Sequence, residues 1–92
     1  MRFASWRLVE ELARLSDVVL ELTDARDPLN TRSPKLESIV TRVGKPLVVV
    51  INKADLVPRD VCEAWSEFFR TRFGYESVYL SARERLGTRI LR

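Results

Sequence analysis

The strongest constraint on the fold is the run of residues 48–55, in which three valines and an isoleucine lead directly into Asn-Lys-Ala-Asp. An unbroken apolar, β-branched run is typical of a strand buried on both faces, as in parallel sheets that helices cover. In open α/β sheets, ligands bind just beyond the carboxyl ends of the strands. Asn52, Lys53 and Asp55 therefore stand where a ligand site is expected.

Helical periodicity and strand-like runs alternate along the rest of the chain. The predicted elements are helices over residues 3–15, 33–43 and 59–73, strands over residues 18–23, 47–51 and 75–80, loops over residues 24–32 and 81–87, and the start of a further helix over residues 88–92. Alternation of this kind is typical of parallel βαβ units. The expected fold class is α/β, with three parallel strands and helices on both faces of the sheet.

The handedness of the crossovers predicts which face each helix covers. Two successive right-handed connections place helices 33–43 and 59–73 on the same face. We expect helix 3–15, together with the final helical stub, to cover the other face. Strand 18–23 is expected to lack a neighbour on its outer edge, and Glu21 within it indicates an edge or a partly solvated face.

Composition limits the class of protein. The 92 residues make one small domain, and their net charge of +3 permits contact with nucleic acid without indicating it. The single cysteine, Cys62, excludes an internal disulfide, and the absence of histidine argues against a zinc site or a histidine-based triad. No run approaches the roughly 20 apolar residues that span a bilayer, and no signal-peptide core opens the chain. A cytoplasmic location, no membrane contact, and no catalytic or metal-binding residue are expected.

The Asn-Lys-x-Asp sequence at the end of a rigid strand suits a guanine base. A carboxylate accepts two parallel hydrogen bonds, and N1–H and N2–H₂ of guanine form such a donor pair, whereas adenine has an acceptor at N1 and no 2-amino group. Asp55 would select guanine by leaving adenine unpaired against a buried charge. Asn52 can tie the loop to its neighbour, and the alkyl stem of Lys53 can lie across the base. The structural alternative is a chance sequence in an ordinary turn.

These residues resemble the guanine-specificity box of GTPases, and Ser81-Ala82 after the next strand is similar to their second base-contacting box. In that family the backbone N–H of the alanine contacts the guanine carbonyl, which implies this role for Ala82. The resemblance implies that the chain forms part of a P-loop-GTPase-like fold. The guanine-binding residues that it implies are Asn52, Lys53, Asp55, Ser81 and Ala82.

Residues 24–34, which begin Asp-Ala-Arg-Asp-Pro, resemble a segment of circularly permuted GTPases of the YlqF/YawG ribosome-assembly group. In that group the base-recognition boxes precede the phosphate-binding boxes. Asp24 and Arg26 are therefore candidate site residues. A local interpretation stays open, in which Asp27 makes a side-chain turn before Pro28 and Arg26 pairs with Asp27 or Asp24.

The chain departs from this family in its phosphate motifs. It contains no Gly-x-x-x-x-Gly-Lys-Ser/Thr and no Asp-x-x-Gly, and its three glycines are Gly44, Gly74 and Gly87. We therefore expect residues 1–92 to form a single, incomplete domain, the guanine-recognition half of a permuted GTP-binding domain. Alone it should bind GTP or GDP weakly and should not hydrolyse GTP, because phosphoryl transfer needs phosphate cradling and a positioned magnesium ion, which only an intact parent would hold. The resemblance implies a parent in ribosome biogenesis, with ribosomal RNA or a ribosomal subunit as partner.

Two functions of other classes stay open. The chain could be a protein-interaction or dimerisation module with a vestigial nucleotide site, which self-associates at the exposed edge of strand 18–23. It could also be a phosphoacceptor domain that uses Asp24 and Lys53, although this function gives Asn52 and Asp55 no purpose.

Overall fold

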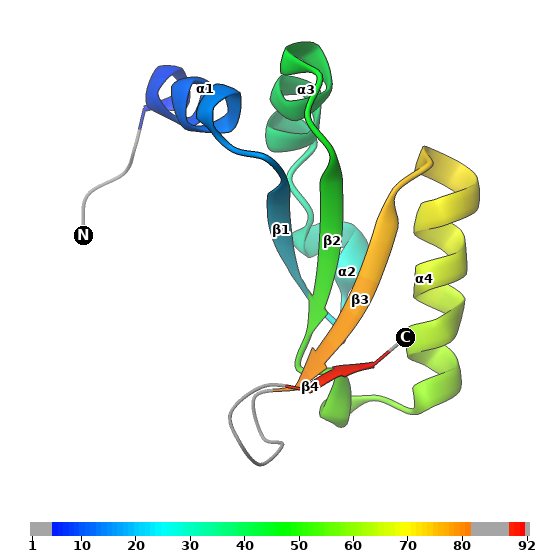
Figure 1. Cartoon of the computed structure of the whole chain (residues 1–92). Helices are drawn as coiled ribbons and strands as arrows, with labels where there is room; N and C mark the ends of the chain where they lie inside the picture. The colour runs from blue at the N-terminus through cyan, green and yellow to red at the C-terminus, as the bar shows by residue number, and fades with distance from the viewer. Residues whose placement is uncertain (1–4, 82–88, 92) are drawn as a thin grey trace.

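A computed structural model describes residues 5–81 and 89–91 of the chain (Figure 1). The elements are α1 (Trp6–Leu15), β1 (Val19–Asp24), α2 (Pro28–Thr31), α3 (Pro34–Val43), β2 (Leu47–Asn52), the short 3-10 turn η1 (Ala54–Leu56), α4 (Arg59–Phe73), β3 (Glu76–Ser81) and β4 (Arg89–Leu91). The three main predicted helices and the three predicted strands are confirmed, with small shifts at their ends.

The strands form one sheet in the order β1-β2-β3-β4. The pairs β1–β2 and β2–β3 are parallel, which confirms the α/β class with three parallel strands. In register, Asp24 of β1 lies opposite Asn52 of β2, and Asn52 lies opposite Leu80 of β3. The carboxyl ends of the three strands therefore meet at one end of the sheet.

Capping signals set the ends of α3, which connects β1 to β2. The Ser33 side chain accepts a hydrogen bond from the backbone N–H of Leu36, and Pro34 occupies the first helical position. Gly44 takes a left-handed φ of 77°, a conformation that a glycine adopts without steric cost, and the helix ends there. The chain then turns back into β2.

Two short segments differ from the prediction. Helix α2 lies inside the predicted loop 24–32, because the Asp27 side chain accepts a hydrogen bond from Asn30 N–H and Pro28 starts the helical turn. Residues 89–91, predicted as the start of a helix, instead form β4, which pairs antiparallel with β3. The outer edge of β3 offers unpaired backbone N–H and C=O groups, and pairing with them overrides a weak helical signal.

Helices α3 and α4 lie on the same face of the sheet, as predicted. Phe69 of α4 packs into a core with Val49 and Ile51 of β2, all three with no exposed surface. Glu21 lies opposite Val49 in register, and its carboxyl group faces Glu37 of α3. β1 is an edge strand, as Glu21 indicated, but Glu21 itself is only 3% exposed, so the alternative that it marks a partly solvated face is wrong.

Helix α1 packs against α3 rather than over the opposite face of the sheet. Glu10 of α1 and Arg42 of α3 form an ion pair at 2.6 Å, and the Lys35 amine lies 5.8 Å from the centroid of the Trp6 ring. The link from α1 to β1 is only residues 16–18, which keeps α1 beside the amino end of β1 (Figure 1). The expectation that helix 3–15 covers the second face is therefore not met.

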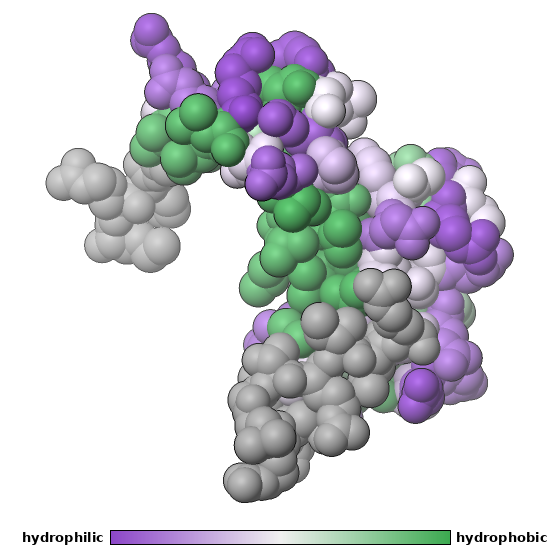
Figure 2. Space-filling view, in the orientation of Figure 1, coloured by the Kyte–Doolittle hydropathy of each residue, from purple (hydrophilic) through white to green (hydrophobic). Residues whose placement is uncertain are grey.

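The second face of the sheet stays open in the part of the chain that the structure describes. Leu20 and Leu22 of β1 point to this face and are 57% and 61% exposed. Figure 2 shows apolar residues gathered over β1 and β2, next to further apolar surface on α1. A parallel sheet normally has both faces covered, so this surface is unusual for the fold class.

Candidate functional site

The carboxyl ends of β2 and β3 bring two of the predicted motifs together. After Asn52, Lys53 takes a left-handed conformation with φ 62° and turns the chain into η1, which carries Asp55. The Ser81 hydroxyl, at the end of β3, donates a hydrogen bond of 2.7 Å to Oδ1 of Asp55. A residue of the second motif thus fixes the carboxylate of the first.

Ser81 and Asp55 differ in their exposure. Ser81 is 1% exposed and belongs to the sheet, whereas Asp55 is exposed to solvent. The penalty for leaving this carboxylate unpaired, which would select guanine over adenine, therefore requires a bound base that removes Asp55 from water. Ala82, the other predicted residue of the second motif, lies outside the described residues.

Asn52 ends β2 with one side-chain atom unsatisfied. Its backbone oxygen accepts a hydrogen bond of 2.8 Å from Ala25 N–H, which ties the end of β2 to the segment after β1. Its side-chain Oδ1 is buried and has no hydrogen-bond partner among the described residues. A buried oxygen of this kind costs free energy unless a donor reaches it, so Asn52 is suited to accept one from a further group.

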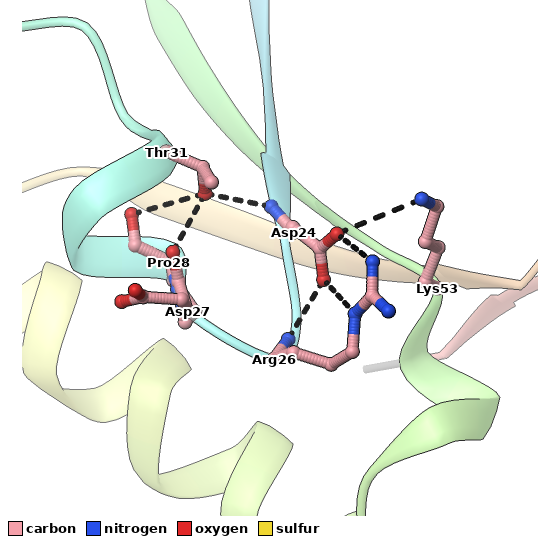
Figure 3. Close-up of polar contacts among 6 residues, drawn as sticks. All are labelled: Asp24, Arg26, Asp27, Pro28, Thr31 and Lys53. Carbon is pink, nitrogen blue, oxygen red and sulfur yellow. Dashed lines mark hydrogen bonds and ion pairs between the residues drawn. The ribbon is translucent and has the colours of Figure 1, made fainter.

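Asp24 and Arg26 form a compact pair after β1, and Figure 3 shows their side chains turned toward each other. Arg26 Nε and Nη2 donate to Oδ1 and Oδ2 of Asp24 at 3.0 and 2.7 Å, and the Arg26 backbone N–H also donates to Oδ1 at 2.9 Å. These hydrogen bonds from Arg26 hold the pKa of the Asp24 carboxyl well below its usual range. The local interpretation, in which Arg26 pairs with Asp24, is confirmed.

Lys53 links this pair to the guanine-box motif. Its Nζ lies 3.6 Å from Oδ2 of Asp24, and its side chain is 51% exposed (Figure 3). The ion pair is long and solvated, so its contribution to stability is small. It draws the Lys53 amine toward Asp24 at the end of β1.

Thr31 of α2 is a site residue that sequence reasoning missed. Its Oγ1 accepts a hydrogen bond of 2.8 Å from the backbone N–H of Asp24 and donates one of 2.8 Å to the backbone oxygen of Asp27 (Figure 3). The hydroxyl thereby fastens α2 to the end of β1. A threonine four residues after a helix-capping Asp27 is a weak signal for this arrangement, because Ser and Thr hydroxyls often bond to nearby backbone.

An open hollow of about 210 Å³ lies beside these groups. Its lining residues are Leu22, Thr23, Asp24, Thr31, Asn52 and Lys53. The hollow thus joins the end of β1 to the end of β2 and carries both charges and neutral polar groups. Pocket positions at the carboxyl ends of parallel strands are where α/β proteins bind ligands.

Two kinds of feature are absent from the described ranges, 5–81 and 89–91. No helix there has both the length and the apolar composition to cross a membrane. No group of three His, Cys, Asp or Glu side chains is placed there to hold a metal ion.

Comparison with known proteins places the chain in a family, although no protein-family model matches it. It is 46% identical over 86 residues to the GTP-binding protein MJ1464 of Methanocaldococcus jannaschii, a match that covers 94% of this chain and 22% of that protein. It is 41% identical over 83 residues to the guanine nucleotide-binding protein-like NSN1 of Arabidopsis thaliana, covering 88% of this chain and 14% of the relative.

A third relative, GTPase LSG1-2 of Arabidopsis thaliana, is 42% identical over 67 residues, which are 71% of this chain and 11% of the relative. The chain thus spans less than a quarter of the length of each of these three proteins. These matches confirm the resemblance found in its motifs. The chain is a homologue of GTP-binding proteins of the MJ1464, NSN1 and LSG1 type, and it matches a minor part of each.

Proposed function

We propose that this chain recognises the guanine base of GTP or GDP, as the base-binding part of a GTP-binding protein. The observation that carries the proposal is the hydrogen bond from Ser81 to Asp55, because it joins the two base-box motifs across the ends of adjacent parallel strands. The names of the relatives, which describe GTP-binding proteins, support the same ligand class.

In the proposed complex each motif residue has one task. The Asp55 carboxylate accepts hydrogen bonds from N1–H and N2–H₂ of guanine, and Ser81 holds that carboxylate in place. The Lys53 stem covers one face of the base, since Asp24 draws its amine along the strand ends. Ala82 supplies a backbone N–H to the guanine carbonyl, as the family resemblance implies.

The proposal predicts weak binding by this chain on its own. The sequence has no glycine-rich phosphate loop, so the charge-assisted hydrogen bonds that such a loop gives to phosphate are missing. Each is worth about 1.5–3 kcal/mol, so we expect a Kd in roughly the millimolar range. For the same reason magnesium would bind only with the phosphates of an intact protein, and the chain alone would not hydrolyse GTP. The buried Oδ1 of Asn52 is a place where an intact protein could donate a hydrogen bond.

The wider role proposed for an intact protein is that of a cytoplasmic GTPase in ribosome biogenesis. This role rests on the Asp-Ala-Arg segment and the two base boxes, which resemble those of the YlqF/YawG group. Its partners would be ribosomal RNA or a ribosomal subunit.

Nuclear magnetic resonance with the ¹⁵N-labelled chain suits an interaction of this strength. Millimolar GDP should shift the backbone amide signals of Lys53, Asp55 and Ser81, whereas ADP should not. Asp55→Asn exchanges one acceptor for a donor, so it should abolish the response to GDP and favour xanthosine diphosphate, whose C2 carbonyl can accept. Asp60→Asn, on the exposed first turn of α4, is the matched control and should respond like the parent chain. Equal responses to GDP and ADP would refute the proposal.

A second candidate function is self-association, with the nucleotide site vestigial. The specific observation in its favour is the exposed apolar face of the sheet, where Leu20 and Leu22 are more than half exposed. The outer edge of β1 also has no partner strand among the described residues. Light scattering distinguishes the functions, because a strict monomer at high concentration would argue against self-association.

A further inference from the structure

Two acidic side chains meet on the covered face of the sheet, and one cation serves both. Glu21 of β1 and Glu37 of α3 are each 3% exposed. Arg32, between α2 and α3, donates from Nε to Oε2 of Glu37 at 3.1 Å and from Nη2 to Oε1 at 2.8 Å. Both oxygens of Glu37 are thus bound by the guanidinium, and a negative charge on Glu21 would have no cation of its own.

The two oxygens of Glu21 have different environments. Oε2 accepts a hydrogen bond of 2.5 Å from the backbone N–H of Ser33, the residue that caps α3. Oε1 is buried and has no hydrogen-bond partner among the described residues. A proton on Oε1 would remove this deficit, because Oε1–H could then donate to the nearby carboxylate of Glu37.

The charged and titratable neighbours of the pair affect the pKa of Glu21. Burial and the neighbouring Glu37 raise the pKa of Glu21 to about 7, against the lowering effects of the Ser33 amide and of Arg32. The pKa of Tyr75, which precedes β3, is raised mainly by burial and further by the negative charge of the same two carboxyl groups. From α4, the Phe73 ring lies 4.3 Å from the Arg32 guanidinium carbon and keeps that cation in place.

Through the Ser33 amide, Glu21 contacts the end of a segment that borders the candidate site. Residues 24–33 leave β1 at Asp24 and return to it at Ser33, whose amide is held by Glu21. Within this segment Thr31 receives the Asp24 amide, so the docking of Ser33 and the position of Asp24 are mechanically linked.

We propose that Glu21 is a positioning residue, which keeps residues 24–33 docked at the strand ends while it shares a proton with Glu37. Loss of this proton places two carboxylates near one guanidinium, and their repulsion, which outweighs the stronger bond of an ionised Glu21 to the Ser33 amide, loosens the segment. The effect of Glu21 on nucleotide binding rests on the proposed guanine site, because Asp24 orients Lys53 there.

The titration can be followed without ligand. The Glu21 carboxyl ¹³C signal should titrate with a midpoint near pH 7, and the amide signals of Ser33 and Asp24 should move with the same midpoint. The chain has no histidine, so apart from the terminal amine no ordinary group interferes in this window. Glu21→Gln can accept from Ser33 and donate to Glu37 like the protonated acid, and its Ser33 and Asp24 signals should stay constant from pH 5.5 to 8. In the control Glu11→Gln, on α1, the Glu21, Ser33 and Asp24 signals should shift with pH as they do in the parent chain.

A Glu21 midpoint near pH 4.5 would overturn the proposal, as would Ser33 and Asp24 signals that ignore the Glu21 titration. If Glu21→Gln does not fold, these two measurements on the parent chain still test the proposal. A GDP titration adds the functional test, since the response at Lys53 should weaken above pH 7 in the parent chain and stay constant in Glu21→Gln. Failure of GDP to bind either protein at pH 6 would refute the guanine site and leave the proton result standing.

Discussion

The two faces of the sheet reverse the usual distribution of residues along β1. On the covered face, β1 places the polar Glu21 and Thr23, each 3% exposed and each hydrogen-bonded, Glu21 to the Ser33 amide and Thr23 to the backbone oxygen of Val50. On the open face, the same strand places Leu20 and Leu22, which are largely exposed. The polar residues of β1 thus fix the geometry next to the site, whereas its apolar residues are suited to a surface that would pack on them.

The largest effect should come from removing the aromatic core of the covered face. Phe69 is fully buried and packs against Trp65 and Phe73, with ring centroids 6.3 and 6.0 Å away. Phe69→Ala should lower the free energy of unfolding by about 3–5 kcal/mol, measured by urea denaturation. Leu22→Ala, on the open face, should cost below ~1 kcal/mol, because little apolar surface is lost from contact. Equal costs would mean that the two faces are equally covered.

The next effect concerns pH. Because Glu21 has a raised pKa in the folded chain, the folded state holds more protons than the unfolded state between pH 4.5 and about pH 7. Stability should therefore fall as pH rises through this window, by at most about 3.5 kcal/mol, and level off above it. Urea midpoints from pH 5 to 8 measure the slope, and Glu21→Gln should flatten it. A parent chain whose stability is constant across this window would contradict the raised pKa.

The covered face also shows where sequence-based prediction succeeds and where it stops. The β2 strand and its Asn52 motif were predictable because a run that is apolar at every position indicates a strand buried on both faces, whichever face each side chain occupies. The family resemblance assigned Ser81 and Asp55 to one base site, and the hydrogen bond between them brings the two side chains together. The burial of Glu21 was not predicted, because alternation within a strand shows which residues share a face but leaves open which face the helices cover.

The other differences have tertiary causes. The position of α1 depends on its packing against α3, which includes the Glu10–Arg42 ion pair and which no periodicity reveals. The strand β4 depends on an unpaired edge that exists only once β3 has joined the sheet. The positions of Asn52, Asp55 and Ser81 at the strand ends were thus predictable from their motifs, whereas the contacts of Thr31 and Glu21, which depend on packing, were not.

Arg32 tests whether the polar groups of the covered face act as a unit. Arg32→Ala leaves Glu37 buried without its cation, and the side chain of Arg32 is itself 17% exposed. We expect a loss of about 2 kcal/mol in unfolding free energy, less than the ~3–5 kcal/mol of a fully buried pair. Arg32→Lys keeps the charge but not the bidentate geometry and should recover part of the loss. If both variants match the parent chain, the ion pair contributes nothing to the covered face.

The smallest effect on monomer stability should come from the open face, where the double variant Leu20→Thr, Leu22→Thr replaces exposed leucines by β-branched polar residues. Threonine suits a strand as well as leucine does, and neither side chain loses a buried contact, so the free energy of unfolding should change by about 0.5 kcal/mol or less. If the open face drives self-association, the same variant should convert an oligomer to a monomer in sedimentation velocity runs at high concentration. Thr23→Ser, on the covered face, is the matched control and should leave the association state unchanged. A double variant that associates like its parent would place any interface elsewhere, while one that loses several kcal/mol would show that the face is already covered within the monomer.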